Sequence, residues 1–145
     1  MTSDFCIAVH AVVYLDHKGC SLSSEQLADN ICTNAARVRK VMAKLKAAGL
    51  IETKEGIEGG YSFTGTASGT TLAVIACALD VRFAEMNWFS GDPDKDCLVS
   101  SGMAGAMESL TAELDSSCMK LLEKKTIADI ENQLFENKGD RHGKV

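Results

Sequence analysis

Proline is almost absent from this sequence, with Pro93 as its single example. Because proline is the residue that interrupts a helix from inside, long helices can form on either side of this position. At 145 residues and 46% hydrophobic content, the chain can bury one core, so we expect one compact unit with an appended element. Helix-favouring residues such as Ala, Leu, Lys, Glu and Met are frequent, and the predicted class is therefore mostly α.

Long hydrophobic runs and an export signal are also lacking. No basic segment precedes an apolar run at the beginning of the sequence, as a secretory signal would require. The longest fully apolar stretch, residues 72–79, is much shorter than a bilayer crossing needs. We therefore expect a cytoplasmic protein with no membrane segment.

Metal-binding and catalytic motifs are missing as well. The six cysteines include no C-x-x-C pair, which excludes zinc-ribbon and thioredoxin patterns, and in a reducing cytosol they are expected to be free thiols. His10, His17 and His142 have no nucleophile or carboxylate at a catalytic spacing. We expect no enzyme activity, no metal site and no cofactor.

Acidic residues are absent from one segment of an otherwise acidic chain. The formal net charge is −5, yet residues 30–50 contain no Asp or Glu. The basic residues of this segment are Arg37, Arg39, Lys40, Lys44 and Lys46. A surface that faces DNA phosphates needs such a local positive charge, so this segment is the predicted DNA-binding element.

The hydrophobic pattern makes this basic segment the third of three helices. Apolar residues at helical spacing predict a first helix over residues 4–15, and Ser23 with Gln26 forms a capping box that opens a short second helix. Thr33 is expected to cap the third helix, which should extend to Ala48 and stop at Gly49. The short connection over residues 30–32 is typical of a helix-turn-helix.

A glycine-tipped hairpin and two further helices are expected after this motif. Residues 50–54 and 61–63 alternate apolar and polar side chains around three glycines, which predicts a small β wing. A buried helix should follow Thr70 or Thr71, and a long helix should begin at Leu98. Thr126 with Asp129 suggests a last helix start. The apolar positions of the long helix form a narrow seam suited to a second copy of the chain, and they are Met103, Met107, Leu110, Leu114, Cys118 and Leu121.

The predicted fold is thus mostly α with a small β wing. A winged helix-turn-helix DNA-binding domain is expected over residues 1–81, a connecting loop over 82–97, dimerisation helices over 98–135 and a disordered tail over 136–145.

The order of these segments resembles the Rrf-two family of bacterial transcription regulators. The resemblance rests on EQLADNICTNAARVRKVMAKLKAAGLIETKEGIEGGYSF, then TTLAVIACALD, then a cysteine ahead of a long helix. Its most specific part is KLKAAGLI followed by a hairpin that ends in GGY. The resemblance implies a homodimeric regulator that binds a palindromic operator in double-stranded DNA. We expect a repressor, with activation as the alternative that the sequence leaves open. The resemblance also implies that the third helix enters the major groove and that the wing reaches a minor groove.

Two departures from the family pattern bear on function. Members with an iron-sulfur cluster share three closely spaced cysteines around position 97, whereas only Cys97 is present here and no Cys or His follows before Cys118. The wing carries Glu55 in place of the usual arginine, with Glu58 beside the tip. A cluster-sensing or small-molecule-sensing regulator, and a winged-helix adapter that binds protein without DNA, therefore remain alternatives.

The start of a recognition helix is the part that faces base edges. We predict that Arg37 contacts guanine and Asn34 contacts adenine, while Lys40 and Lys44 contact phosphates. A solvated basic face is the alternative, and Tyr61 fits the core of the wing base better than base stacking. The complete predicted DNA-binding set is Thr33, Asn34, Ala35, Arg37, Arg39, Lys40, Lys44, Gly59, Gly60 and Tyr61.

Two cysteines are candidates for redox sensing. Cys32 precedes the start of a helix with arginines nearby, which favours the thiolate, whereas Asp92, Asp94 and Asp96 surround Cys97 and oppose its ionisation. We predict that oxidation joins Cys32 of one subunit to Cys97 of the other, with an inert role for both as the alternative. The thiols on apolar faces are expected to act as small hydrophobic residues, and they are Cys6, Cys77 and Cys118.

Overall fold

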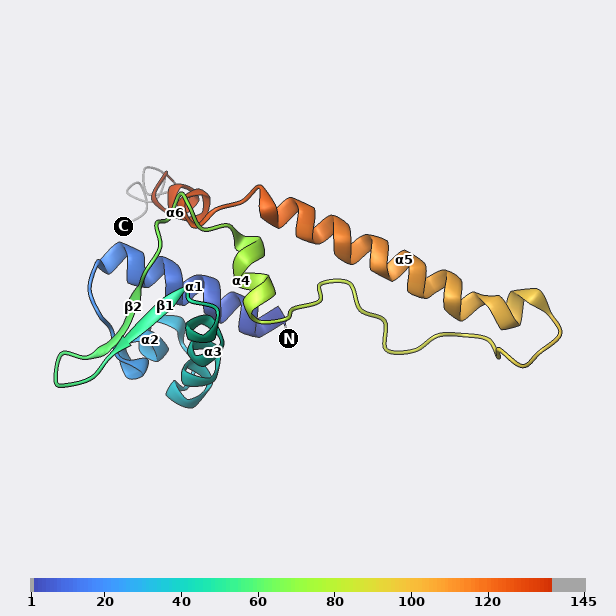
Figure 1. Ribbon diagram of the computed structural model, residues 1–145, viewed down its shortest axis with the longest axis horizontal. Coiled ribbons are helices and arrows are strands. Elements are labelled where there is room, and N and C mark those ends of the chain that lie inside the picture. Colours follow the sequence, from blue (N-terminus) through green and yellow to red (C-terminus); the bar gives the residue numbers. More distant parts are fainter. Residues whose placement is uncertain (1, 137–145) are drawn as a thin grey trace, which may run out of the picture. The chain divides into compact units, whose positions relative to one another are not determined.

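The computed structural model describes residues 2–136, and Figure 1 shows the order of its elements. These are α1 (Thr2–Lys18), α2 (Ser24–Ile31), α3 (Ala35–Ala47), β1 (Ile51–Lys54), β2 (Gly60–Phe63), α4 (Leu72–Ala78), α5 (Leu98–Glu123) and α6 (Ile127–Glu136). The predicted class, mostly α with a small β wing, is confirmed. Residues 137–145 of the tail that we predicted to be disordered lie outside the described residues.

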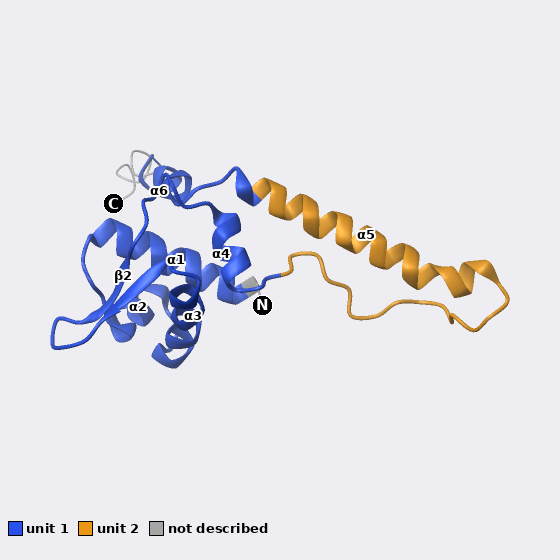
Figure 2. Cartoon of the chain, viewed as in Figure 1, with its two compact units in different colours: residues 1–81, 122–145 blue, residues 82–121 orange. Residues whose placement is uncertain are grey.

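The chain forms two compact units, which are coloured separately in Figure 2. The first unit combines residues 1–81 with residues 122–145, and the second unit contains residues 82–121. The chain therefore leaves the first unit after Val81 and re-enters it at Leu122.

The core of the first unit lies between α1, α2 and α3. Ala8, Ala11 and Val12 of α1 are fully buried. The predicted apolar stripe of α3 also faces inward, and its members are Val38, Val41, Met42 and Leu45. Full burial of a large aliphatic side chain stabilises a fold by about 1.5–3 kcal/mol, so this stripe fixes which face of α3 remains outside.

The turn between α2 and α3 differs by one residue from the prediction. The capping box of α2 is confirmed, because Ser23 Oγ accepts from the amide of Gln26 at 3.1 Å and Gln26 Oε1 accepts from the amide of Ser23 at 2.8 Å. The cap of α3 is Asn34, not Thr33. Cys32 ends α2 in the left-handed region with a φ of 65°, and the amide of Thr33 still donates to Ala28, so Thr33 belongs to the end of α2.

The wing is a two-stranded antiparallel sheet in which Ile51 pairs with Phe63 and Lys54 with Gly60. Its base is attached to the segment between α1 and α2, since Leu22 and Tyr61 exchange backbone hydrogen bonds of 3.0 and 2.8 Å. The close approach of these two backbone segments requires glycine at position 60. Its φ is +148°, and a Cβ atom there would lie 2.3 Å from the carbonyl oxygen of Leu22.

The last helix completes the first unit. Leu72 donates its amide to Lys125 at 2.8 Å, and Ile127 donates to Thr70 at 3.0 Å, so the segments before α4 and α6 pair with each other. Ile127 is fully buried, and α6 packs against α1. The predicted cap is confirmed, because Asp129 Oδ2 accepts from the amide of Thr126 at 2.8 Å. The sequence grouped α6 with α5, whereas contacts place it in the first unit.

The second unit consists of the connecting loop and most of α5. Asp115 Oδ1 accepts from the amides of Phe83 and Ala84 at 2.8 and 3.3 Å, which attaches the loop to the helix. None of the 26 residues of α5 is buried, and Leu110 and Leu114 are 43% and 45% exposed. Within residues 2–136, no helix has the length and apolarity needed to cross a membrane.

Candidate nucleic-acid interface

The outer face of α3 carries three basic side chains. Arg37, Lys40 and Lys44 are spaced three and four residues apart, which places them on one side of the helix, and all three are exposed. This side flanks the buried stripe, about a third of a turn around the helix from its centre. Because the apolar stripe is the buried part of α3, these three basic side chains form a positively charged strip that faces solvent. They do not point into the core.

Arg37 is held by the start of α1. Its Nη2 donates to Ser3 Oγ at 2.6 Å and to Asp4 Oδ1 at 3.3 Å. The arginine side chain nevertheless remains 42% exposed. A surface ion pair of this kind stabilises by about 0–1 kcal/mol, so a phosphate or a base could replace Asp4 at small cost.

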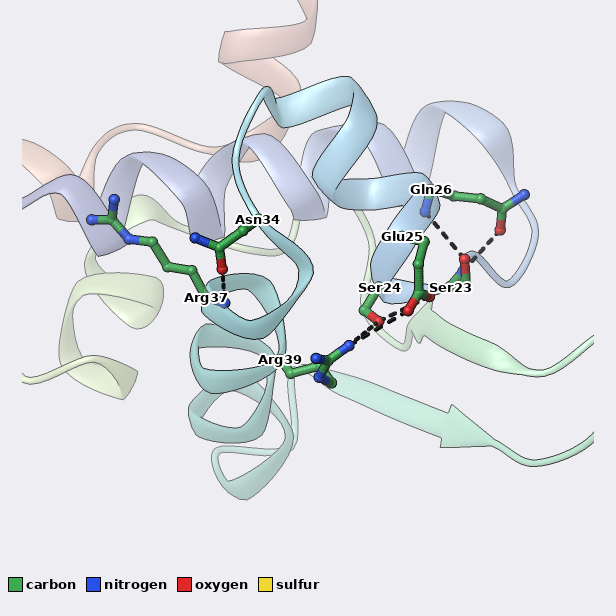
Figure 3. Close-up of polar contacts among 7 residues, drawn as sticks. All are labelled: Ser23, Ser24, Glu25, Gln26, Asn34, Arg37 and Arg39. Carbon is green, nitrogen blue, oxygen red and sulfur yellow. Dashed lines mark hydrogen bonds and ion pairs between the residues drawn. The ribbon is translucent and has the colours of Figure 1, made fainter.

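Arg39 lies on a different side of α3 and points toward the start of α2, as Figure 3 shows. Its Nη1 donates to Ser24 Oγ at 3.2 Å and to Glu25 Oε1 at 3.5 Å. The backbone amide of Glu25 lowers the pKa of this carboxyl, with further lowering by the Ser24 hydroxyl and by Arg39. The carboxylate therefore stays charged, and Arg39 links α3 to α2.

Asn34 has a structural role that limits its use in base recognition. Its Oδ1 accepts from the amide of Arg37 at 2.8 Å, which caps α3 (Figure 3). A bidentate contact with adenine needs both the oxygen and the nitrogen of the amide. A contact of Asn34 with adenine would have to be made in the orientation that the cap imposes on its side chain.

The other predicted residues of the helix are accessible. Thr33, in the turn before α3, and Ala35, the first residue of α3, are both half-buried. Lys40 and Lys44 are exposed and have no hydrogen bond or ion pair within residues 2–136. Lys46 instead donates to Thr53 Oγ1 of β1 at 2.7 Å. The two free lysines are thus the side chains best placed to contact phosphates.

The wing presents more acidic than basic groups. Glu55 and Glu58 are exposed around its tip, where Ile57 is fully exposed. Gly59 and Gly60 are half-buried, as is Tyr61, whose backbone joins the wing base to Leu22. These three residues shape the wing, and none of them supplies a positive charge.

The structure changes the predicted roles of the cysteines. Cys32 closes α2 and does not open α3, and its thiol donates to the carbonyl oxygen of Asp29 at 3.7 Å, so the predicted helix-start environment is absent. Cys97 directly precedes α5, and hydrogen bonds from the backbone amides of Ser100 and Val99 lower the pKa of its thiol. The expectation that the neighbouring aspartates raise this pKa is wrong, because the backbone hydrogen bonds at the helix start favour the thiolate.

The remaining cysteines are also more accessible than the apolar pattern suggested. Cys6 and Cys77 are exposed, and Cys118 is half-buried. The prediction that they fill apolar space is wrong for Cys6 and Cys77, since each lies at the edge of the apolar stripe of its helix.

A helix-turn-helix with a positive outer face, followed by a β hairpin, defines a winged helix-turn-helix DNA-binding protein. The chain belongs to the Rrf2 family, described as an iron-dependent transcriptional regulator, whose model matches residues 1–133. The family resemblance predicted from the sequence is thereby confirmed, as is the expectation that the chain is not an enzyme.

Individual relatives agree with this assignment. YwnA of Bacillus subtilis strain 168, described as an HTH-type transcriptional regulator, is 24% identical over 93% of this chain and 99% of its own length. The crystal structure of a transcriptional regulator from Lactobacillus plantarum shares the fold with a TM-score of 0.80 at 20% identity, covering 99% of this chain and 97% of the other. IscR of T. potens gives a TM-score of 0.66 at 17% identity over 92% of this chain and 87% of its own.

The family description mentions iron, and the residues of this chain do not fit an iron site. Three cysteine ligands would be needed near position 97, and Cys97 is the single cysteine between Cys77 and Cys118. Within residues 2–136, no three side chains of His, Cys, Asp or Glu lie together as metal ligands would.

Proposed function

We propose that this chain is a sequence-specific transcriptional repressor that binds a palindromic DNA operator as a homodimer. The exposed strip of Arg37, Lys40 and Lys44 on α3 supports this proposal most strongly. In the major groove, Arg37 near the helix start would contact base edges, and the two lysines would contact phosphates. The wing would lie at the minor groove through its backbone around Gly59 and Gly60.

A binding titration on operator DNA selected from genomic fragments tests this assignment. Replacing Lys40 or Lys44 by alanine should weaken binding to all sequences alike and reduce the salt slope by about 1. Replacing Arg37 by alanine should cost about 1–3 kcal/mol and relax specificity at one base position. Lys124→Ala, at an exposed lysine on a distant segment, is the matched control. Equal affinity of all variants would contradict the proposal.

The dimer is proposed from the apolar seam of α5. Helices in proteins gain most of their stability from packing, and none of the 26 residues of α5 is buried in the single chain. The exposed leucines of the seam suit a coiled contact with the same helix of a second copy. Leu110→Glu and Leu114→Glu should give a monomer in analytical ultracentrifugation. Ala112→Glu adds the same charge on the opposite side of α5 and should leave the dimer intact. A monomeric wild-type protein would refute this part.

DNA-binding experiments also separate a repressor from a winged-helix adapter that binds protein and not DNA. A repressor should protect a palindrome in footprinting, and deletion of its gene should raise transcription from that site. The acidic wing with Ile57 exposed at its tip is the feature that favours a protein-binding adapter. An adapter would ignore DNA even at low salt.

We also propose that Cys97 begins a redox response. Its thiolate would attack a peroxide or hypochlorous acid, taking up oxygen as a sulfenic acid and releasing water or chloride. The thiol of Cys32 from the partner subunit would then attack this sulfur, forming a disulfide and releasing water. Both thiols are exposed, and the lowered pKa of Cys97 makes it the better nucleophile of a reaction that needs a thiolate.

Non-reducing electrophoresis tests this response. Hypochlorite should convert the wild-type protein to a covalent dimer, and both Cys97→Ser and Cys32→Ser should abolish it. Cys20→Ser, at another exposed cysteine, is the control. A monomer band in every lane would refute the proposal.

A further inference from the structure

A concave groove lies between α1 and α6 of the first unit, away from the outer face of α3. Its volume is about 480 Å³. Ligand sites in proteins typically enclose about 300–1,000 Å³, so this groove has the size of a small-molecule site. Phe135 stacks near His17 at one end, with ring centroids 4.9 Å apart, which gives the groove a defined border.

The lining is apolar with a few hydrogen-bonding groups. Its apolar part includes Phe5, Val9, Val13, Leu72, Ile130 and Leu134. Among the described residues 2–136, no Asp, Glu, Lys or Arg contributes to this lining, so the described part of the groove offers a charged ligand no ion pair. Polar atoms come from His10, Tyr14 and Asn30, and His10 Nε2 lies 2.7 Å from Asn30 Oδ1. This combination suits an uncharged, mainly aromatic or aliphatic molecule with one or two hydrogen-bonding groups.

The structure favours such a molecule over a second copy of the chain. The unpartnered seam of α5 already provides a place for the second copy, and it lies in the other compact unit. The concave shape and the size of the groove match a compact ligand better than a helix, which would need a longer apolar surface.

Residues of the groove are neighbours in the chain of two features that hold α3, namely the turn at Cys32 and the ion pair of Asp4 with Arg37. Asn30 lies in the last turn of α2, two residues before Cys32, whose left-handed conformation makes the turn into α3. Phe5 follows Asp4, which holds Arg37. A ligand that contacts Phe5 or replaces the His10–Asn30 hydrogen bond therefore acts on residues adjacent to the recognition helix.

We infer that this groove binds a small uncharged apolar effector and that its occupation changes the affinity of α3 for DNA. The regulatory half of this inference rests on the proposed DNA binding. Allosteric coupling between two sites commonly changes affinity by about 5- to 150-fold, and an effect of this size is expected here.

N-phenyl-1-naphthylamine, an uncharged aromatic amine whose emission rises in apolar surroundings, is the probe for this site. The full-length wild-type protein should bind one probe molecule per chain. Val9→Trp fills the groove and should weaken probe binding more than tenfold. Val74→Trp makes the same change at a valine of α4 that is 44% exposed and does not line the groove, and it should bind like wild type. Leu134→Asp, at a rim residue that is 56% exposed, should also weaken binding and avoids filling the interior.

The outcomes separate the inference from the proposed function. DNA affinity is first measured without the probe, and loss of DNA binding there would count against the proposed function alone. Saturating probe should then shift the DNA affinity of wild type and Val74→Trp about 5- to 150-fold, and should leave Val9→Trp unchanged. Absence of probe binding to wild type, equal binding by all variants, or binding without any shift in DNA affinity would overturn the inference. Binding by the Leu110→Glu monomer alone would show that a second copy covers the groove, which would also overturn it.

Discussion

The two arginines of α3 show how individual side chains can be both structural and functional. Arg37 and Arg39 each contact an acidic residue of another helix, Asp4 and Glu25 respectively. Both ion pairs are at the surface, where such pairs contribute about 0–1 kcal/mol. They orient the guanidinium groups in the free protein. Under the proposed function Arg37 would exchange Asp4 for DNA with little loss of stability, whereas Arg39 keeps its link to α2.

Gly60 provides a direct test of the contact between the wing and the rest of the first unit. Gly60→Ala should destabilise the protein by about 1–3 kcal/mol, since the new Cβ would lie 2.3 Å from the Leu22 carbonyl oxygen at a φ of +148°. Urea unfolding followed by circular dichroism measures the change. Gly102→Ala in α5, where nothing lies within 4 Å of the added Cβ, should be neutral or stabilise by up to about 1 kcal/mol. Equal stabilities of the two variants would contradict the close approach.

Sequence patterns predicted contacts between residues close in the chain better than contacts between residues far apart. The capping boxes at Ser23 and Thr126 were predictable because both partners lie three residues apart on the same helix. The shift of the α3 cap to Asn34 was not, because it depends on the left-handed conformation of Cys32. The contacts of Arg37 with Asp4 and of Arg39 with Glu25 also join residues distant in sequence, for which no local pattern exists.

Two carboxyl groups, one on α1 and one on α6, interact where these helices pack together. Burial raises the pKa of Glu131 on α6 to about 7, with a further contribution from Asp16 of α1. Within residues 2–136, Glu131 Oε1 is buried without a hydrogen-bond partner. Two ionised carboxylates cannot donate to each other, so a proton shared between them would provide the missing hydrogen bond.

This pair predicts a pH dependence of stability. The folded pKa of about 7 lies above the ordinary pKa of 4.5 for a glutamate side chain, so the folded state binds more protons than the unfolded state between these values. The contribution of Glu131 to the free energy of unfolding is therefore fully present below about pH 4.5 and is lost as pH rises through 7. Thermal melts at pH 5.5 and 8 should differ less for Glu131→Gln than for wild type. Glu136→Gln, exposed on the same helix, should behave like wild type, and identical pH profiles of all three proteins would refute the effect.

The existence and order of the helices followed from the sequence, whereas their partners did not. The periodicity of α3 placed its buried residues correctly, because a helix repeats every 3.6 residues whatever it packs against. The apolar seam of α5 stays a prediction. The position of α6 depends on the pairing of Thr71 with Thr126, which lie far apart in the chain. The groove between α1 and α6 follows from that pairing and has no signature in either helix alone.

The charge distribution of the complete molecule governs its response to salt. The net charge of −5 repels DNA, so under the proposed function attraction would be confined to the basic face of α3. If a dimer neutralises roughly six to ten phosphates, its affinity should fall by about 10³- to 10⁵-fold between roughly 50 and 200 mM salt. Fluorescence anisotropy on operator DNA and on a scrambled duplex measures both the slope and the specificity. A flat response would be incompatible with phosphate contacts by the α3 lysines.

The first unit is assembled from two stretches of chain, with residues 82–121 between them, and this order has a consequence during synthesis. Ile127 is a fully buried residue of the first unit, and it is translated 46 positions after Val81. At about 5–20 residues per second, roughly 2 to 9 s pass between the synthesis of Val81 and the synthesis of Ile127, which completes the core of the first unit. The hydrophobic interior is open to chaperones on the ribosome throughout that interval, and it closes only after the whole of α5 has been made.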